Sequence, residues 1–290
     1  MKKIVEIKNL TKSYGKSRGI ENIDLQIEKG TIYGFIGPNG AGKSTTIKCI
    51  MSLINKNSGE IFINGEPVTK KNYKIKEKIG YLPSEIHLYE DMKVKDVFKY
   101  SESFYSKDCS KRTYELAKKL DLDINKKIDE LSLGNLKKVG IIVSLMHRPE
   151  ILIMDEATSG LDPLMQEAFY DILLKEKEKG TTVFFSSHIL SEIKRICDKV
   201  AVIKEGKVIK IDEIDNITSA QAVKISLISK DINNILREIK AQALTVTENK
   251  AEFIYKEDIS DLISALSKYK LEKLLIEEPA IEEIFMHYYQ

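Results

Sequence analysis

The residues whose types and spacing most clearly suit a chemical role are 37–44, which match the pattern G-x-x-x-x-G-K-[ST]. In this pattern the glycines let the backbone wrap around an anion and turn its N–H groups inward. Lys43 would reach the β- and γ-phosphates of a nucleotide as a point charge, and the Ser44 hydroxyl would bind Mg²⁺. The sequence therefore predicts a nucleoside triphosphate site. Its residues are Gly37, Pro38, Asn39, Gly40, Ala41, Gly42, Lys43, Ser44 and Thr45.

The residues on either side of this loop support the prediction. Residues 31–36 form an apolar run typical of a strand, and residues 44–53 place Ile47, Ile50 and Met51 at helical spacing. The positive N-terminal end of such a helix favours an anion. A glycine-rich turn that fits the pattern by chance would need neither the strand nor the helix, so we favour the phosphate-binding loop.

Two carboxylates follow a second apolar run. Residues 151–154 are continuously apolar, as in a strand of a parallel sheet that is covered on both faces, and Asp155 and Glu156 come next. Burying charged groups at the end of a strand costs free energy unless they bind a cation or transfer a proton. In a P-loop protein, Asp155 would hold Mg²⁺ through its water shell, and Glu156 would polarise the attacking water.

Two further residues could belong to the same site. His188 follows an apolar run at residues 182–185, and ligands of open α/β sheets bind at the carboxyl ends of strands. Tyr14 lies in an expected loop, where an aromatic ring could stack on a nucleotide base. A helix cap explains a lone histidine, and an ordinary turn residue explains a lone tyrosine. Residue type and spacing alone leave both assignments open.

The elements expected around these residues form an α/β domain of the P-loop NTPase type. Alternating apolar and polar residues predict half-buried strands at residues 3–8 and 22–28. Asn64-Gly65 between two short β-like runs is a strong hairpin signal. Residues 92–147 change to helical periodicity, which indicates a helical subdomain inserted between strands of the sheet.

The pattern changes again after residue 210. The expected order there is β-α-β-β-α-β, which is the order of a ferredoxin-like unit, followed by a last helix at residues 281–289. We find no nucleotide motif in this part of the sequence. The predicted organisation is an NTP-binding domain at residues 1–210, a linker at 211–220 and an accessory α+β domain at 221–290.

Composition argues against several classes of protein. The net charge is +2, from 46 basic and 44 acidic residues, so no basic field points to nucleic acid. The three cysteines lie far apart, which argues against a zinc site or a disulfide framework and suggests a reducing cytosol. No apolar run approaches the length of a membrane span, and the N-terminus has no signal-peptide core. A role at a membrane would therefore require a partner.

Taken in order, these motifs resemble the ATP-binding subunits of ABC transporters over residues 1 to about 210. Tyr14 lies where that family has its adenine-stacking aromatic. Residues 37–45 and 151–156 resemble its Walker A and Walker B motifs, and His188 stands at its switch histidine. The places of the signature motif and the D-loop are occupied by residues 131–135 and 159–162.

The resemblance implies that the protein binds and hydrolyses ATP with Mg²⁺. Glu156 would be the general base, His188 would orient the γ-phosphate and the water, and Lys43 would balance charge. Two copies, or this chain and a related one, would pair head to tail, so that Ser132 and Gly134 of one chain complete the ATP site of the other. Closing of the pair would drive transmembrane permease subunits from the cytoplasmic face of the cell membrane.

Two positions depart from the family pattern. The signature reads LSLGN where the family has LSGGQ, so that Leu133 replaces a glycine and Asn135 a glutamine. After the Tyr-Leu-Pro strand the family has a glutamine that senses Mg²⁺, whereas this sequence has Ser84 followed by Glu85. Glu85 could serve as an oxygen ligand in its place, and a solvated loop carboxylate is the alternative.

Residues 83–91 and 282–285 resemble the exporter branch often called ABC-2, which implies export. Two other functions stay open. A soluble ABC-type ATPase acting on nucleic acid or ribosomes usually carries a long coiled coil, a zinc module or a second ATPase half, and this sequence shows none of them. A low-turnover regulatory subunit that only holds ATP fits the altered signature, but Glu156 and His188 argue against it.

Overall fold

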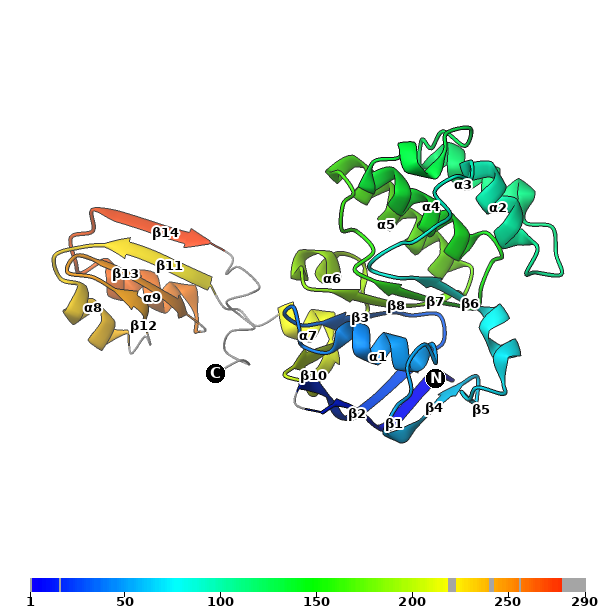
Figure 1. Ribbon diagram of the computed structural model, residues 1–290. Helices are drawn as coiled ribbons and strands as arrows, with labels where there is room; N and C mark the ends of the chain where they lie inside the picture. Colours follow the sequence, from blue (N-terminus) through cyan, green and yellow to red (C-terminus); the bar gives the residue numbers. More distant parts are fainter. Residues whose placement is uncertain (1, 16, 219–222, 240–242, 256, 278–290) are drawn as a thin grey trace. The chain divides into compact units, whose positions relative to one another are not determined.

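The computed structural model describes residues 2–15, 17–218, 223–239, 243–255 and 257–277 (Figure 1). The chain divides into two compact units, Met1–Ile214 and Asp215–Gln290. Each unit has a hydrophobic core of its own. The predicted α/β core and the predicted small α+β domain therefore correspond to separate bodies.

The first unit is built on a six-stranded sheet. Its order is β10 (Lys207–Glu213), β9 (Lys199–Lys204), β3 (Ile32–Ile36), β8 (Thr182–Ser187), β7 (Ile151–Asp155) and β6 (Ile79–Leu82). All neighbouring strands are parallel except β10, which is antiparallel to β9. Strands β3, β7 and β8 are buried along their whole length, which confirms the apolar runs as strands covered on both faces.

A second, antiparallel sheet has the order β2 (Ser17–Glu28), β1 (Lys3–Tyr14), β4 (Ser58–Ile63) and β5 (Glu66–Pro67). The hairpin predicted at Asn64-Gly65 joins β4 to β5. Both turn residues have positive φ, 53° and 80°, as a tight two-residue hairpin requires. Strands β1 and β2 are longer than predicted, because their pairing continues to Tyr14↔Ser17 through several register shifts that interrupt the alternation.

Helices cover both faces of the six-stranded sheet. Helix α1 (Lys43–Ile50) lies between the two sheets, and its Ile47 and Ile50 belong to a core shared by strands of both (Figure 1). It ends before the predicted residue 53, because the chain turns at Ser52, where φ is 52°. The opposite face of the sheet carries α4 (Leu133–Leu145), α5 (Pro163–Glu178) and α6 (Leu190–Ile196) (Figure 1).

The predicted helical subdomain is confirmed. It contains α2 (Val94–Glu102), α3 (Ser110–Lys119), the short 3₁₀ helix η2 (Ile128–Glu130) and α4. Another 3₁₀ helix, η1 (Tyr73–Lys78), precedes it in the chain. Helices α2 and α3 bury Val97, Phe98 and Leu116 on one face, as their amphipathic patterns predict. Its last helix, α4, returns the chain to the central sheet, where it leads into β7.

The second unit has the predicted ferredoxin-like topology. Its elements are β11 (Val223–Ile228), α8 (Ile232–Glu238), β12 (Ala243–Val246), β13 (Lys250–Tyr255), α9 (Ile259–Leu266) and β14 (Lys273–Glu277). The antiparallel sheet has the order β12-β13-β11-β14, and both helices contribute to one core with Ile225 and Phe253. The last helix, predicted at residues 281–289, lies outside the described residues.

Most of the region predicted as a linker, residues 211–220, has regular secondary structure instead. Strand β10 continues to Glu213 because its partner β9 begins at Lys199, and the two residues pair. A short helix, α7 (Ile214–Thr218), follows directly. Regular structure therefore occupies the range up to residue 218.

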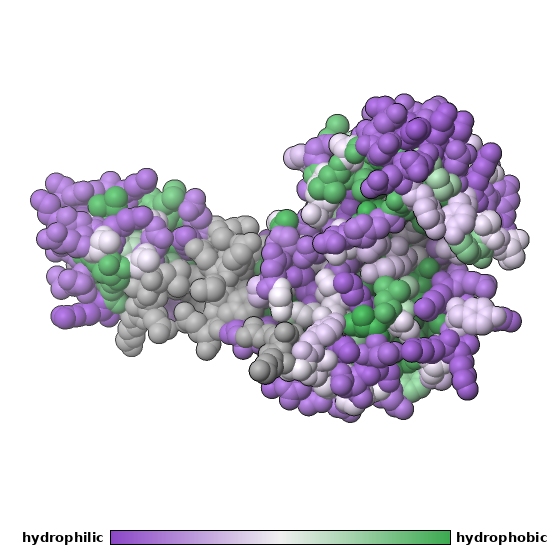
Figure 2. All heavy atoms as spheres, viewed as in Figure 1, coloured by the Kyte–Doolittle hydropathy of each residue, from purple (hydrophilic) through white to green (hydrophobic). Residues whose placement is uncertain are grey.

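Within the part of the chain that the structure describes, no helix has the length and apolar character needed to cross a membrane. Figure 2 shows mainly hydrophilic residues on this face of the helical subdomain and of the second unit, with apolar residues in small groups.

Candidate active site

The glycine-rich loop, the acidic pair and His188 meet at the carboxyl ends of three central strands. In the sheet register Ile36 of β3 pairs with Ser187 of β8, and Asp155 of β7 pairs with Ser186. The glycine-rich loop, Glu156 and His188 follow these strand ends directly and therefore start from one edge of the sheet. This edge is where open α/β sheets bind ligands.

Two glycines of the loop are needed for its close packing. A Cβ atom on Gly37 would lie 2.3 Å from the carbonyl oxygen of Ile203. Gly42, the N-cap of α1, has a φ of 111°, and a Cβ there would lie 2.6 Å from the Ile20 side chain. Larger residues at either position would displace the loop from strand β9 or from β2. The loop backbone is thus held in place before any nucleotide arrives.

The Lys43 ammonium is buried inside the loop. The side chain is 4% exposed, and Nζ donates to the carbonyl oxygens of Gly37 at 2.8 Å and Pro38 at 3.2 Å. The same nitrogen lies 3.4 Å from Oε1 of Glu156. These contacts fix the cation at the N-terminus of α1, where a phosphate group would be favoured by both the charge and the helix end.

Glu156 connects the loop to the predicted switch histidine. Its Oε1 lies 3.4 Å from Lys43 Nζ and 3.4 Å from His188 Nδ1. The residue has a φ of 48°, a conformation unusual for a side chain of this size. Its N–H donates to the Ser186 carbonyl oxygen at 3.2 Å, which holds this backbone in place. The structure therefore brings together the three residues to which sequence reasoning assigned catalytic roles.

Asp155 presents a buried oxygen that has no partner. The side chain is fully buried, and its Oδ1 accepts a hydrogen bond from Ser186 Oγ at 2.7 Å. Its Oδ2 has no hydrogen-bond partner among the described residues. An unpaired buried carboxylate oxygen costs free energy that a cation would recover. Asp155, with the half-buried Ser44 at the start of α1, therefore fits a Mg²⁺ ion.

Sequence reasoning missed two residues at this site, Ser186 and Lys137. Ser186 stands beside Asp155 in the neighbouring strand, and the polar end of an otherwise apolar run was the available signal. Lys137 is 2% exposed, and its Nζ donates to the Ser84 carbonyl oxygen at 3.0 Å. Burial lowers the pKa of Lys137, and the negative charges of Asp155 and Glu156 oppose this shift.

The contacts of the signature residues are to their own helix and to the D-loop. Ser132 is the N-cap of α4, and its Oγ accepts from the Asn135 N–H at 3.3 Å. A Cβ on Gly134 would lie 2.7 Å from the Gly160 carbonyl oxygen, so the signature packs against the D-loop. Leu133 is 68% exposed. Within the described residues, no hydrogen bond or ion pair joins Ser132 to the glycine-rich loop.

Two other predicted site residues are not drawn into this cluster. Tyr14 is the last residue of β1 and is 46% exposed, with the Lys12 ammonium 5.0 Å from its ring centroid. Glu85 has an 87% exposed side chain, and its carboxylate lies 3.7 Å from His87 Nε2. Neither forms a hydrogen bond or ion pair with the loop or with Asp155 in the described ranges. Their predicted roles remain predictions.

The features of a P-loop ATPase are present. They are a mainly parallel sheet, a glycine-rich loop around a buried lysine, and an acidic pair after a central strand. Residues 20–159 match the family model described as ABC transporter. The "Uncharacterized ABC transporter ATP-binding protein MJ1023" of Methanocaldococcus jannaschii is 36% identical over 287 residues, covering 96% of this chain and all of that protein. The "Lantibiotic transport ATP-binding protein SrtF" of Streptococcus pyogenes is 37% identical over 214 residues, covering 73% of this chain and 92% of that protein.

Among solved structures, the fold is similar to the dimeric ATP-binding cassette MJ0796 in a post-hydrolysis state with ADP and Pi. The TM-score is 0.66 and the identity 26%, over 73% of this chain and 99% of that one. This chain belongs to the ABC transporter ATP-binding proteins and is an ATP-hydrolysing subunit of that family. These findings confirm the predicted family and fold and favour the transporter over the two alternative functions.

Proposed function

We propose that this chain drives export through separate transmembrane subunits, as part of a homodimer or heterodimer of ATP-binding subunits at the cytoplasmic face of the membrane. The division of the ATP site carries the proposal. Lys43 and His188 both contact Glu156, whereas Gly134 packs against the D-loop and, among the described residues, Ser132 has no hydrogen bond to the nucleotide loop. The dimeric arrangement of the MJ0796 cassette supports completion of each site by a second chain.

Hydrolysis would begin with a change of partner at Lys43. Its ammonium lies 3.4 Å from Glu156, and a γ-phosphate carries more negative charge than one carboxylate. We expect the ammonium to turn to the phosphate, which leaves Glu156 free to accept a proton from the attacking water. His188 Nδ1, also 3.4 Å from Oε1, would then orient the carboxylate and the water.

When bound, Mg²⁺ supplies positive charge at the β- and γ-phosphates. Ser44 and the unpaired Oδ2 of Asp155 are the groups that would hold it, directly or through water. Ser186 keeps the Asp155 carboxylate in one orientation through the 2.7 Å hydrogen bond to Oδ1. Glu85 is proposed only as an additional oxygen ligand, and Tyr14 as the stacking partner of the adenine.

An exposed aromatic ladder supports docking of a membrane subunit on the helical subdomain. Tyr89, Tyr100 and Phe104 are 63%, 46% and 63% exposed. Their rings meet edge to face, with centroids 5.9 Å apart for the two tyrosines and 5.1 Å apart for Tyr100 and Phe104. Exposed aromatic groups of this kind are enriched at protein interfaces. The ladder begins in the segment at residues 84–91, through which we propose that domain closure reaches the permease.

The export direction rests on relatives. The name of SrtF assigns it to lantibiotic transport, and its match covers 73% of this chain. The resemblance of residues 83–91 to the ABC-2 branch points the same way.

The test is ATP-dependent dimerisation of the full chain. Glu156→Gln, which should trap ATP, is expected to be a monomer without nucleotide and a dimer with ATP and Mg²⁺ by size exclusion with light scattering. Adding Ser132→Arg, which places a bulky cation at the proposed interface, should keep it monomeric. A Glu156→Gln protein that stays monomeric at saturating ATP would contradict the proposal.

A further inference from the structure

A buried carboxylate outside the predicted site connects two of its segments. Glu192 lies on α6 and is 5% exposed. One of its oxygens accepts a hydrogen bond from Thr158 Oγ1 at 2.6 Å, and the other accepts one from Ser187 Oγ at 2.5 Å. These are short, charge-assisted hydrogen bonds in a water-excluded place, which makes them strong and directional.

The two hydroxyl donors flank the catalytic residues. Thr158 comes two residues after Glu156, in the turn that leads to the D-loop, and its carbonyl oxygen accepts the Leu161 N–H at 3.0 Å. Ser187 directly precedes His188. The Glu192 carboxylate therefore ties the chain after the general base to the chain before the switch histidine.

The Glu192 carboxylate has hydroxyl donors and no ion-pair partner among the described residues. Within the described ranges, no Lys or Arg forms an ion pair with Glu192, and the nearby Arg195 pairs with Glu167 instead. Burial, and after it the negative charge of Glu192, raise the pKa of the Tyr170 hydroxyl on α5. A buried charge held only by hydroxyl groups is an expensive arrangement for stability alone.

We infer that Glu192 is a positioning residue for ATP hydrolysis: by holding Thr158 and Ser187 at one carboxylate it fixes Glu156 and His188 relative to each other. The inference rests on the proposed catalytic roles of Glu156 and His188. The contact it maintains is the 3.4 Å approach of His188 Nδ1 to Glu156 Oε1. Small displacements of a general base cost large factors in rate, so loss of the tie should appear in kcat.

The main variant is Glu192→Met, which keeps the length of the side chain and removes both acceptor oxygens. We expect kcat for ATP hydrolysis to fall roughly 10- to 100-fold, with KM for ATP changed less than about two-fold. Glu192→Gln keeps one carbonyl acceptor and should fall between Glu192→Met and the wild type. A Glu192→Met protein with wild-type kcat would overturn the inference.

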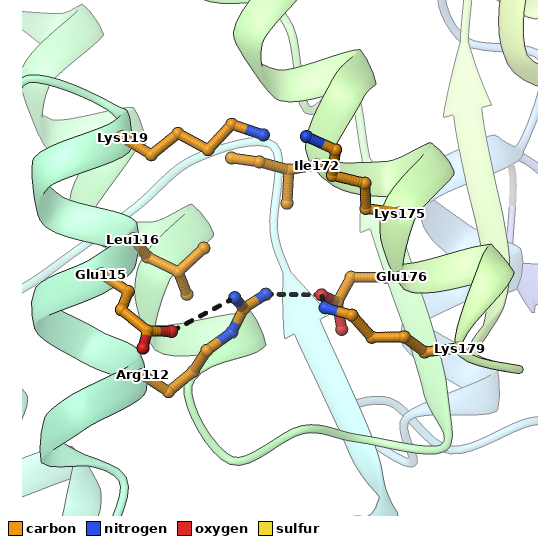
Figure 3. A pocket seen from close by; sticks show the side chains of 8 residues that line it. All are labelled: Arg112, Glu115, Leu116, Lys119, Ile172, Lys175, Glu176 and Lys179. Carbon is orange, nitrogen blue, oxygen red and sulfur yellow. Dashed lines mark hydrogen bonds and ion pairs between the residues drawn. The ribbon is translucent and has the colours of Figure 1, made fainter.

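A second buried carboxylate provides the control. Glu176 on α5 is 3% exposed, and its Oε1 lies 2.5 Å from Arg112 Nη2 and 2.8 Å from Lys179 Nζ. Figure 3 shows it reaching Arg112 of α3 at a pocket whose upper rim carries Lys119 and Lys175, without any of the catalytic residues. Glu176→Met should lower thermal stability while leaving kcat within about two-fold of the wild type. Equal losses of kcat in the two variants would mean that Glu192 has only a structural role, which would overturn the inference.

A double-mutant cycle tests whether Glu192 acts through the switch histidine. In a His188→Ala background, Glu192→Met should lower kcat by less than about three-fold. The full 10- to 100-fold loss in that background would show an independent effect and overturn the inference. Should Glu192→Met fail to fold, Thr158→Val and Ser187→Ala each remove one of the hydrogen bonds from these two residues to Glu192. Wild-type kcat in both variants would also overturn the inference.

The same measurements separate the inference from the function on which it rests. If Glu156→Gln and His188→Ala themselves hydrolyse ATP at the wild-type rate, the proposed catalytic roles fail. If both are slow while Glu192→Met is not, only the inference about Glu192 fails.

Discussion

The two halves of the predicted ATP site are built in opposite ways. The half at the sheet edge consists of charged side chains in contact, with Lys43 4% exposed and Asp155 fully buried. The half at the start of α4 is a helix cap and a glycine beside the D-loop, and it leaves Leu133 68% exposed. The contacts of the first half lie within one chain, whereas among the described residues no hydrogen bond or ion pair joins Ser132 of the second half to the glycine-rich loop.

This difference follows from how each half is held. The sheet-edge half is held by hydrogen bonds from Ser186, to the loop carbonyl groups and to the Glu192 carboxylate, so the protein itself orients its charges. Among the described residues Asp155 Oδ2 has no hydrogen-bond partner, which costs about 1–3 kcal/mol that a bound cation would offset. Substitutions in the first half should therefore act in a single chain, and those in the second half only in a dimer.

The largest effect is expected from Lys43→Ala. This change removes a buried ammonium from the phosphate site, and two charge-assisted hydrogen bonds correspond to roughly 10²–10⁴-fold in ATP affinity. Isothermal titration calorimetry on the full chain measures it. Lys48→Ala, on the exposed side of α1, is the matched control and should bind ATP like the wild type. Unchanged affinity in Lys43→Ala would contradict the assignment of the loop.

Glu156→Gln should leave ATP affinity nearly unchanged and lower the rate of hydrolysis roughly 10²–10⁴-fold, which is the size of a general-base contribution. Phosphate release at saturating ATP is the measurement. Glu150→Gln removes an exposed carboxylate before β7 and should hydrolyse ATP normally. Wild-type turnover in Glu156→Gln would mean that another group activates the water.

Gly134→Ala tests the half of the site that the signature forms at the start of α4. The added Cβ would lie 2.7 Å from the Gly160 carbonyl oxygen, so the signature and the D-loop must move apart. We expect at least about a 10-fold loss of turnover, because small misplacements at a composite site are costly, with ATP affinity of the monomer retained. If ATP affinity of the monomer fell as steeply as turnover, the two halves would not be separate.

The smallest effect is expected from Leu133→Ser. Since the side chain is largely exposed, the free energy of unfolding in urea should change by less than about 0.5 kcal/mol. If Leu133 is buried against a second chain, ATP-dependent dimerisation should weaken by about 1–2 kcal/mol. A large loss of stability with unchanged dimerisation would place Leu133 inside its own chain instead.

Local signals made much of the fold predictable. The glycine-rich loop, the apolar runs of β3, β7 and β8 and the Asn64-Gly65 turn are each encoded within a few neighbouring residues. The ferredoxin-like order of the second unit followed from short alternating segments. Element ends were less predictable, because β10 extends to Glu213 only to pair with the start of β9.

The ties around the active site could not be predicted in the same way. These contacts are hydrogen bonds between residues that are distant in the sequence or lie on different elements. They join Ser186 to Asp155, Lys137 to Ser84, and Glu192 to Thr158 and Ser187. A lysine or glutamate on a helix looks like an exposed residue until the fold shows which face is buried. The charged residues of the site were found through motifs, and the residues that hold them through tertiary contacts.

The central claim is that each ATP site takes its loop from one chain and its signature from another. The most direct test mixes two impaired proteins, Lys43→Ala with an intact signature and Ser132→Ala, which has an intact loop and lacks the signature hydroxyl without adding bulk at the interface. With random pairing of independent sites, the mixture should regain up to about a quarter of wild-type ATPase activity, because only the mixed dimer contains a complete site. A mixture as inactive as its components would contradict the claim.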